Sequence, residues 1–451
     1  MMKQSYRVSI ILFLFISVFM GDISAAQLDP LLEKLTLSGY MRMRTWYTGS
    51  SIKIPGYFPG SGDFEQVNYE DLFFRNRIYI SVLPELEIRS VFDISSKFGH
   101  DDFAMGQGGT NLVTRDVYAL FRPGENMEFS LGLMPFSLPG GYILARDATG
   151  LRYQHDLLNK RLKLYVSLIR AFDDADTGYN DTTDIPSYAD DNIFIFGGDL
   201  ALLQDLESQV YYVLEVDRYT SSGDEDPDFL THYFIDDGRQ STLHWLGIHN
   251  KYIINDFNLK FGAILNAGYI RTKAEYTDEP FIRTDILACL WEFEAAWKWR
   301  DLQVSLAAEG ATGDPRDAAS GGSFQDIKAS HGFSLIAVDN TGGLAIRGSG
   351  ESSWYGLAGQ GLKFQYTLFN AVLVKLGAVH VRTLKNISWN GSSSTWYGDE
   401  CDLEAEYKYR EVLSVTASAA AFFPGDAYRG IVQDSSHGVI LECMLGASVT
   451  Y

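Results

Sequence analysis

Hydrophobic and polar residues alternate one by one along the last stretch of the chain. Every second position from Val439 to Tyr451 is apolar or aromatic, and the positions between them are mostly small or polar. A period of two residues places alternate side chains on opposite faces of a β-strand. A last strand that is apolar on one face and ends on an aromatic residue is typical of a transmembrane β-barrel, whose outer face meets lipid and whose inner face meets water.

The same alternation recurs along the chain and predicts eighteen strands. They cover residues 35–47, 71–83, 86–96, 113–122, 127–135, 149–154, 160–171, 193–203, 208–219, 241–254, 257–273, 283–298, 301–311, 354–368, 371–384, 398–410, 411–423 and 438–451.

The links between these strands are alternately short and long. The short links are 84–85, 123–126, 155–159, 204–207, 255–256, 300, 369–370 and 410–411. Every other link is longer and richer in Gly, Asp and Ser, as in 48–70, 97–112, 172–192, 220–240 and 312–353. A soluble sandwich would show turn signals without this alternation. We therefore predict an all-β, transmembrane, up-and-down antiparallel β-barrel with short periplasmic turns and long external loops.

Aromatic residues gather at the ends of the predicted strands. Trp46-Tyr47, Trp354-Tyr355, Trp396-Tyr397 and Phe422-Phe423 lie where strands meet long loops, and Trp297, Trp299, Tyr407 and Tyr409 lie near short turns. Amphipathic rings favour both interfaces of a membrane, so two aromatic belts are expected.

The first residues predict the compartment. Lys3 and Arg7 precede an apolar run from Val8 to Met20, and the small residues Ser24-Ala25-Ala26 follow. We expect a secretory signal peptide over 1–26, cleaved before Gln27, and a barrel over 27–451 in the outer membrane of a Gram-negative-type bacterium. The alternative is a single membrane anchor, for which the apolar run is short.

Composition and charge exclude some classes of function. The formal net charge of −21 argues against a nucleic-acid partner. Cys289, Cys401 and Cys443 all fall on the apolar face, so we interpret them as small hydrophobes; no disulfide framework, metal or cofactor is predicted. The acidic links 172–192 and 220–240 are either solvated surface charge or sites where divalent cations bridge to lipopolysaccharide, and neither contains an EF-hand-type loop.

Charged residues fall on the face that the alternation directs into the barrel. These predicted pore-lining residues are Arg42, Arg44, Arg75, Arg77, Arg89, Asp93, Lys163, Lys363, Lys375, Glu292, Glu294, Asp402, Glu404 and Glu406. Five of the arginines lie on three neighbouring strands, and most of the acids lie on two others. One interpretation is a polar channel with a basic and an acidic wall, whose transverse field steers ions. The other is a plugged lumen in which the charges pair across strands.

The longest link, 312–353, contains the apolar piece Phe333–Val338. Long loops are often functional, and an apolar piece is unfavourable in water. We hypothesise that this link folds into the mouth of the barrel as a constriction or lid.

A stretch of the C-terminal region, from Gly398 to Ala427, resembles a known family. Gly398-Asp399-Glu400-Cys401-Asp402-Leu403, followed by Phe422-Phe423-Pro424-Gly425-Asp426, is similar to the closing region of the alginate-export family of outer-membrane barrels, with the pattern G-x-E-x-D-L and then F-x-P-G-D. Thr312-Gly313-Asp314-Pro315 also fits. The resemblance implies an eighteen-stranded barrel and a channel role. One departure is Gly132-Leu133-Met134, where the family commonly shows G-R-Q.

Four functions remain open. The leading one is a channel for small hydrophilic, anionic solutes or saccharides, and the alternative is secretion of an acidic polysaccharide. An enzymatic barrel would need a catalytic group, but no G-x-S-x-G motif occurs and His244 and His249 differ in strand parity. An adhesin would use the long loops. The expected partners are outer-membrane lipid, lipopolysaccharide, a solute, and the barrel-assembly machinery through the strand that ends at Tyr451.

Overall fold

The computed structural model describes residues 34–50, 66–100, 111–171, 191–203, 205–217, 240–272, 282–313, 356–432 and 438–451. Among these residues, no helix has the length and apolar character needed to cross a membrane. The predicted signal peptide lies outside the described residues, as does almost all of the two acidic links and of 312–353, so the predictions made for them stay predictions.

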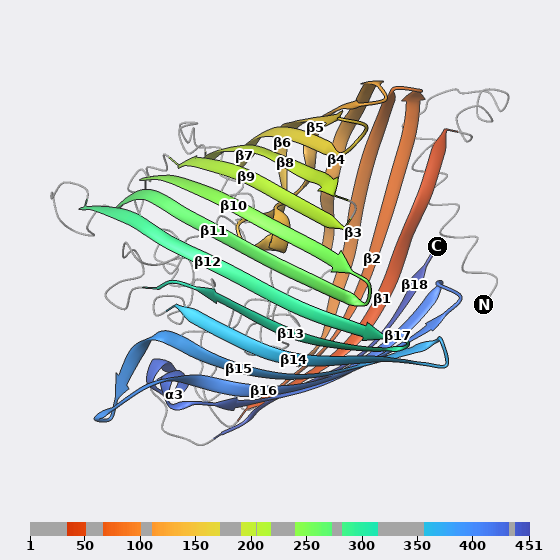
Figure 1. The fold of residues 1–451 in the computed structure, drawn as a ribbon. Helices are drawn as coiled ribbons and strands as arrows, with labels where there is room; N and C mark the ends of the chain where they lie inside the picture. The colour runs from red at the N-terminus through yellow and green to blue at the C-terminus, as the bar shows by residue number, and fades with distance from the viewer. Residues whose placement is uncertain are drawn as a thin grey trace, which may run out of the picture.

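The described residues form eighteen antiparallel strands and two short helical segments (Figure 1). The elements are β1 (Leu35–Ser50), β2 (Gln66–Leu83), β3 (Leu86–His100), β4 (Asn111–Gly124), β5 (Met127–Ser137), η1 (Pro139–Gly141), β6 (Ala145–Leu157), β7 (Leu162–Ala171), β8 (Asp191–Leu203), β9 (Leu206–Asp217), β10 (Gln240–Ile254), β11 (Phe257–Thr272), β12 (Ile282–Trp299), β13 (Leu302–Ala311), β14 (Leu357–Leu368), β15 (Val372–Trp389), β16 (Ser392–Tyr409), β17 (Leu413–Pro424), α3 (Asp426–Val432) and β18 (Ile440–Thr450).

The sheet closes on itself. Each strand pairs with its neighbours in sequence, and β1 pairs with both β2 and β18. The closing seam runs from Tyr40 opposite Thr450 to Ser50 opposite Ile440. The backbone N–H groups of Gly39 and Tyr451 each donate to the other residue's carbonyl, at 3.1 and 3.0 Å, which extends the seam to the last residue. The predicted all-β barrel and its eighteen strands are confirmed.

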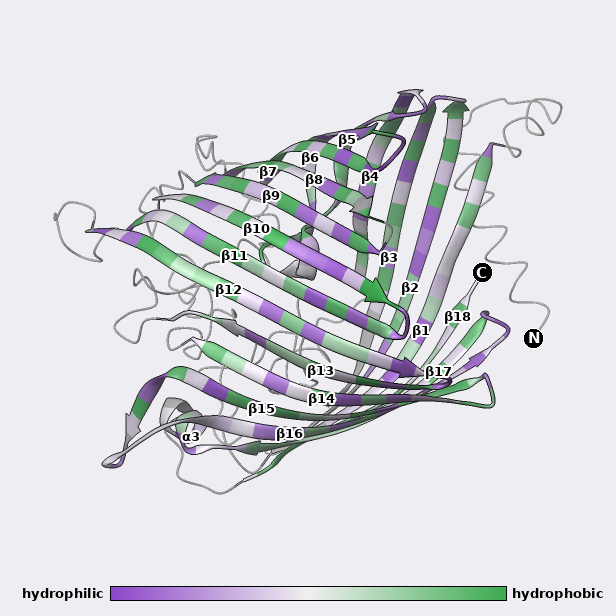
Figure 2. Ribbon diagram, viewed as in Figure 1, coloured by the Kyte–Doolittle hydropathy of each residue, from purple (hydrophilic) through white to green (hydrophobic). Residues whose placement is uncertain are grey.

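The two faces of the barrel have the predicted polarity over most of its wall. Bands of hydrophobic and hydrophilic residues alternate along the strands in Figure 2. On β1, Leu37, Met41 and Met43 are exposed large hydrophobic residues, whereas Arg42 and Arg44 bond to Asp71 on the opposite face. Because all backbone groups of a closed barrel pair within the sheet, such a barrel can expose apolar side chains to lipid. The three cysteines are free and exposed, in keeping with the parity assigned to them.

The eight predicted short links are confirmed, but strict alternation is wrong at one place. A long loop was expected between residues 384 and 398, but most of these residues extend strands β15 and β16. The two strands join through a two-residue turn, Asn390-Gly391. Both residues have positive φ, 48° and 79°, as a type I′ turn requires. Two register shifts, at Val381/Arg382 and Arg382/Ile387, separate this outer part of the hairpin from the barrel wall. Asn-Gly is a strong hairpin signal that alternation alone does not detect.

The aromatic belts are confirmed near the short turns and only partly near the long loops. Trp297, Trp299, Tyr407 and Tyr409 are all exposed. At the other end, only one ring of each described pair faces out. Tyr47, Trp396 and Phe423 are exposed, while Trp46 donates to Asp71 inside the barrel and Tyr397 and Phe422 pack on Tyr428 of α3.

Part of the inner wall is apolar, which the sequence did not predict. Inward residues of β7 to β12 near the long-loop end are fully or almost fully buried; they include Ile169, Ile193, Ile195, Val213, Leu243, Trp245, Ile264, Ile286 and Leu290. Their strands are apolar on both faces, as in Ile193-Phe194-Ile195-Phe196. A period-two pattern cannot distinguish the two faces of such a strand.

The polarity of the two faces yields a first prediction. Leu445 lies at the centre of β18 and is 59 % exposed on the outer face. Leu445→Arg should lower the free energy of unfolding by about 2–4 kcal/mol, because it places a charge at the membrane midplane. The measurement is a guanidinium unfolding curve in lipid vesicles. Met444→Arg, one residue away on the inner face, is the matched control and should cost much less; equal losses would contradict the assigned faces.

Candidate functional site

A short apolar segment between β5 and β6 folds into the barrel, where Figure 1 draws it behind β9 and β10. This inward segment comprises residues 138–144. Leu138, Tyr142, Ile143 and Leu144 are at most 4 % exposed and belong to the inner apolar cluster. The Leu138 N–H donates to the Leu144 carbonyl at 2.9 Å, which closes the segment into a loop. Burial of these apolar side chains against the inner wall holds the segment inside the barrel.

Glycine makes this loop possible. Gly140 and Gly141 have φ of 72° and 66°, in the left-handed region that other residues rarely adopt. At Gly140 a Cβ atom would lie 2.3 Å from two ring carbons of Tyr142. The ring of Tyr142 therefore packs directly on the backbone at Gly140.

The side chain of Tyr142 connects the inward segment to a remote part of the barrel wall. Its hydroxyl lies 2.8 Å from Glu292 Oε2 on β12 and 2.9 Å from Glu309 Oε2 on β13. Strands β6 and β13 are seven apart in sheet order, and half the circumference is nine strands. The inward segment is thus fixed at its root on β5 and β6 and at its tip on the remote wall.

A histidine and a second tyrosine complete this contact. His249 Nδ1 lies 2.6 Å from Glu292 Oε1, and His249 Nε2 lies 3.1 Å from the Tyr211 hydroxyl. The His249 ring lies nearly parallel to the rings of Tyr142 and Tyr211, with centroids 6.4 and 5.7 Å away. Gly262 lies between His249 and Glu292 in the register of β10, β11 and β12. A Cβ there would be 2.5 Å from Glu292 Oε1, so the glycine leaves room for the contact between the two side chains.

The phenol of Tyr142 stays protonated. Burial, and then the negative charges of Glu309 and Glu292, raise its pKa well above the ordinary range of a tyrosine. A neutral phenol is one donor and also an acceptor, so it can connect two carboxyl groups.

The predicted arginines line one side of the barrel, on β1, β2 and β3. This arginine wall consists of Arg42, Arg44, Arg75, Arg77 and Arg89. Carboxylates hold four of them: Asp71 lies 2.6 Å from Arg44 and 3.8 Å from Arg42, Asp93 lies 2.6 Å from Arg75, and Glu87 lies 2.5 Å from Arg89. Arg115 of β4 also pairs with Asp93, at 2.8 Å.

Aromatic rings further restrict these arginines. The guanidinium groups of Arg42 and Arg75 lie 5.0 and 5.4 Å from the Phe73 ring centroid, and that of Arg77 lies 6.0 Å from the Tyr40 centroid. A guanidinium has five N–H donors, so one that binds a carboxylate and stacks on a ring keeps donors for a solute. Five arginines face three carboxylates here, which leaves two positive charges in excess on these strands.

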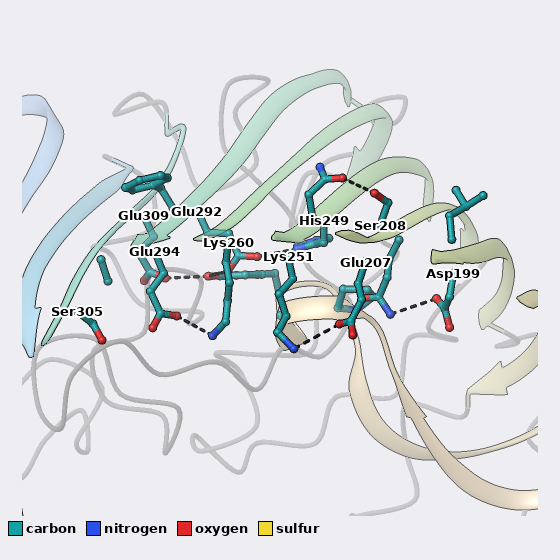
Figure 3. A pocket seen from close by; sticks show the side chains of 18 of the residues that line it. Asp199, Glu207, Ser208, His249, Lys251, Lys260, Glu292, Glu294, Ser305 and Glu309 are labelled. Carbon is teal, nitrogen blue, oxygen red and sulfur yellow. Dashed lines mark hydrogen bonds and ion pairs between the residues drawn. The ribbon is translucent and has the colours of Figure 1, made fainter. Parts of the chain in front are cut away.

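A cavity of about 770 Å³ lies beside the inward segment, toward the short turns (Figure 3). Gly140, Tyr142, His249, Glu292 and Glu309 line it, together with lysines and carboxylates that alternate along the wall; these are Lys160, Lys163, Asp199, Glu207, Lys251, Lys260, Glu294 and Lys363. Lys260 pairs with Glu294 at 2.7 Å, and Lys251 pairs with Glu207 at 3.4 Å. The structure thus brings the predicted Lys163, Lys363, Glu292 and Glu294 to one cavity.

The remaining predicted acids lie on β16, apart from that cavity. Lys375 of β15 bonds to Glu404, its direct partner in register. Glu406 accepts from Ser414 at 2.9 Å and pairs with Lys408 at 3.2 Å, and Asp402 stands opposite Gly377. Pairing across strands, on which the second interpretation of the lumen charges depends, occurs at Lys375–Glu404 and Lys260–Glu294. It also occurs in the arginine wall, at Arg44–Asp71 and Arg75–Asp93.

Several residues of the site were not predicted. The sequence pattern does not identify Tyr142, Glu309 or the carboxylate Asp71, and it gives His249 no catalytic role, because no catalytic motif occurs and His249 differs in parity from His244. The signal for Tyr142 was Leu138-Pro139-Gly140-Gly141 followed by three apolar residues, which is unusual for an exposed link. The prediction that the two histidines face opposite sides of the sheet is confirmed. His249 lies inside the barrel and is 7 % exposed, whereas His244 is on the other face, where it bonds to Tyr212. Within the described ranges, no group of three or more His, Cys, Asp or Glu side chains could hold a metal ion.

Comparison with solved structures supports the fold. OccK5 (OpdH) of Pseudomonas aeruginosa aligns with a TM-score of 0.53 and 11 % identity, over 92 % of this chain and 98 % of that one. OccK8 (OprE) of the same organism aligns with a TM-score of 0.53 and 13 % identity, over 92 % and 98 %. The outer membrane protein OprD, also of P. aeruginosa, aligns with a TM-score of 0.51 and 12 % identity, over 92 % and 94 %. At these low identities the similarity shows the fold alone, which is the eighteen-stranded barrel.

No family model matches this sequence, and no curated protein matches it significantly. The resemblance to the alginate-export family is therefore not supported specifically. The coarser inference from it, a closed β-barrel of this size, is the part that the solved structures support.

The fold of the inward segment can be tested at Gly140. Gly140→Ala should lower the free energy of unfolding by about 1–3 kcal/mol, because alanine is strained at this φ and its Cβ meets the Tyr142 ring. The measurement is denaturant unfolding in detergent micelles. Gly124→Ala, at a short turn with nothing within 4 Å of the new Cβ, is the control and should change little. A Gly140→Ala protein as stable as the parent would contradict the described loop.

Proposed function

We propose that this chain is an outer-membrane, porin-type channel that passes small hydrophilic solutes and favours anions. The observation that carries the proposal is the arginine wall, because its guanidinium groups are held in place and exceed the carboxylates beside them. Guanidinium groups that face the lumen attract an anion from solution by their positive charge. Their N–H donors then replace part of the water that hydrates the anion.

The inward segment defines the path of the solute. It packs against the inner wall on the side of β9 to β13. Its described contacts do not include the arginine wall of β1 to β3, so that wall stays open to the lumen. A solute would pass between the arginine wall and the inward segment and then reach the cavity that Lys163, Lys260 and Lys363 line. An eighteen-stranded barrel is wide, so an inward segment that narrows it gives size selection.

Secretion of an acidic polysaccharide is the second candidate. A polyanion would need a continuous basic path, whereas Glu292, Glu294, Asp402, Glu404 and Glu406 interrupt the inner wall with negative charge. The inward segment also makes a long polymer a poor fit. A catalytic role is not proposed, because His249 is engaged by Glu292 and Tyr211, and the two central histidines do not share a face.

Lipid, lipopolysaccharide and the barrel-assembly machinery remain the proposed partners. The apolar outer face supports a lipid environment. The side chain of Tyr451 stacks on Phe74 at 5.9 Å and donates to Asn76 Oδ1 at 2.6 Å, so the proposed assembly signal is also part of the finished closing seam.

The anion preference makes a direct prediction. Replacing Arg42, Arg44, Arg75 and Arg77 together with Ala should remove it, because the carboxylates Asp71 and Asp93 would then dominate that wall. Single channels in a planar bilayer under a salt gradient should show a reversal potential moved toward the cation side.

A matched control removes basic residues outside the lumen. Arg161, Arg300 and Arg410 lie at short turns. Their replacement with Ala should leave the reversal potential close to that of the parent, since exposed charges at the rim are screened by salt. An unaltered reversal potential in the quadruple arginine variant would rule out the proposed role of the arginine wall.

A further inference from the structure

Two arginines face each other on the outer surface of the barrel, at the long-loop ends of β11 and β12 (Figure 1). Arg271 of β11 is directly opposite Arg283 of β12 in the strand register. Their positions share the parity of Leu265 and Leu287, which are 47 and 68 % exposed on the outer face. Neither arginine therefore belongs to the arginine wall or points into the lumen.

One aromatic ring holds both guanidinium groups. That of Arg271 lies 5.2 Å from the ring centroid of Tyr269, and that of Arg283 lies 4.4 Å from it. The Tyr269 hydroxyl accepts a hydrogen bond from Thr242 of β10 at 3.1 Å, which helps to fix the ring. Cation–π contact with a fixed ring restricts both arginines in advance, so less conformational entropy is lost when they bind an anion.

The two arginines keep an excess of positive charge. Like charges directly opposite each other on a sheet are destabilising. Asp285 compensates part of this repulsion, since Nε and Nη2 of Arg283 each lie 2.8 Å from its Oδ1 atom. Two guanidinium groups beside one carboxylate still leave one positive charge. The Arg283 side chain is 52 % exposed and that of Asp285 is 73 % exposed, so an anion can reach them from outside.

The position along β12 places these charges at the level of lipid headgroups. Arg283 stands fourteen residues before Trp297, an exposed ring of the aromatic belt near the short turns. At roughly 3.4 Å per residue and a tilt of about 35–45°, that separation is a height of about 34–39 Å. The apolar band of such a barrel is about 25 Å tall. The arginines therefore lie just beyond the hydrocarbon on the long-loop side.

We propose that Arg271 and Arg283, together with the ring of Tyr269, bind a phosphate group of lipopolysaccharide in the outer leaflet. The inference rests on the proposed outer-membrane function, which supplies that lipid. A phosphate monoester carries about −1.5 to −2 charges and three strong acceptor oxygens, so it can accept from two guanidinium groups at once and offset their repulsion. The contact is direct and needs no divalent cation, unlike the bridging predicted for the acidic links.

Two variants change the site in opposite directions. Arg271→Gln/Arg283→Gln removes both positive charges and keeps side chains of similar length, so it should weaken binding. Asp285→Asn removes the carboxylate that competes with the phosphate for Arg283, so it should strengthen binding. All of these side chains lie on the surface at the ends of the strands, where such changes disturb the barrel little.

The matched control removes two arginines of the same kind from the opposite rim. Arg300 and Arg410 lie at short turns, with guanidinium groups 5.2 and 5.3 Å from the ring centroids of Trp299 and Tyr409. Each is stacked on its own ring, so the two do not converge on one phosphate. Arg300→Gln/Arg410→Gln changes the net charge as much as the first variant does and should leave binding unchanged.

The experiment is a titration of the folded barrel in detergent with lipid A, the phosphorylated lipid part of lipopolysaccharide, read by native mass spectrometry. A chelator removes divalent cations and with them any bridging to the acidic links. The double variant at positions 271 and 283 should bind about 10-fold or more weakly than the parent, because a hydrogen bond to a charged group contributes roughly that factor. Dephosphorylated lipid A should bind the parent as weakly.

Three results would overturn the proposal. They are equal affinity of the parent and of Arg271→Gln/Arg283→Gln for lipid A, equal affinity of the parent for lipid A with and without its phosphates, and an Asp285→Asn protein that binds no more tightly than the parent. An equal loss of affinity in the control at Arg300 and Arg410 would also overturn it, because net charge alone would then explain the effect.

The same proteins separate this inference from the proposed channel. Arg271 and Arg283 lie outside the lumen, so their double variant should keep the reversal potential of the parent. A barrel that binds lipid A through these arginines and carries no current would support the lipid site and contradict the channel. A conducting barrel whose affinity for lipid A is the same in the double variant would overturn the lipid site alone.

Discussion

The hydrogen bond between backbone groups is the interaction on which this molecule depends. Hydrocarbon offers no partner for an unpaired N–H or C=O group, so a sheet that enters a membrane has to close. Here β1 and β18 make that closure, and Gly39 and Tyr451 extend it to the last residue. Once the sheet is closed, every side chain points either to lipid or into the lumen. The alternation of the sequence, the exposed apolar residues of the outer face and the inward direction of the arginines are consequences of that choice.

The inner wall then has to accommodate charge and apolar surface together. Carboxylates and aromatic rings hold the arginines of β1 to β3. On the far side, β7 to β12 present apolar side chains inward, and the inward segment buries its own apolar side chains against them. Tyr142 ties the tip of that segment to polar groups of the same wall. The outcome is an asymmetric lumen, with a basic side on β1 to β3 and an apolar side that carries the inward segment.

The sequence predicted features that depend on local pattern and missed those that depend on long-range contact. Strand number, short turns, the parity of Arg42 or Leu445 and the exposure of Cys443 all follow from alternation, which is a property of neighbouring residues. Tyr142 meets residues 150 and 167 positions away, and no local pattern encodes such a distance. The β15–β16 hairpin was missed for a different reason: its signal, Asn390-Gly391, is a matter of turn chemistry. The constriction predicted for 312–353 lies almost entirely outside the described residues and stays a prediction, and the segment that the structure places inside the barrel is 138–144.

The central claim is that solutes cross this barrel along its arginine wall, and the reversal potential of the unmodified protein tests it most directly. The protein would be refolded, inserted into a planar bilayer and recorded as single channels across a salt gradient. Stable conductance with a reversal potential on the anion side is the predicted result. A reversal potential on the cation side would transfer control to the carboxylates of β12 to β16. A folded barrel that carries no current would contradict the channel itself.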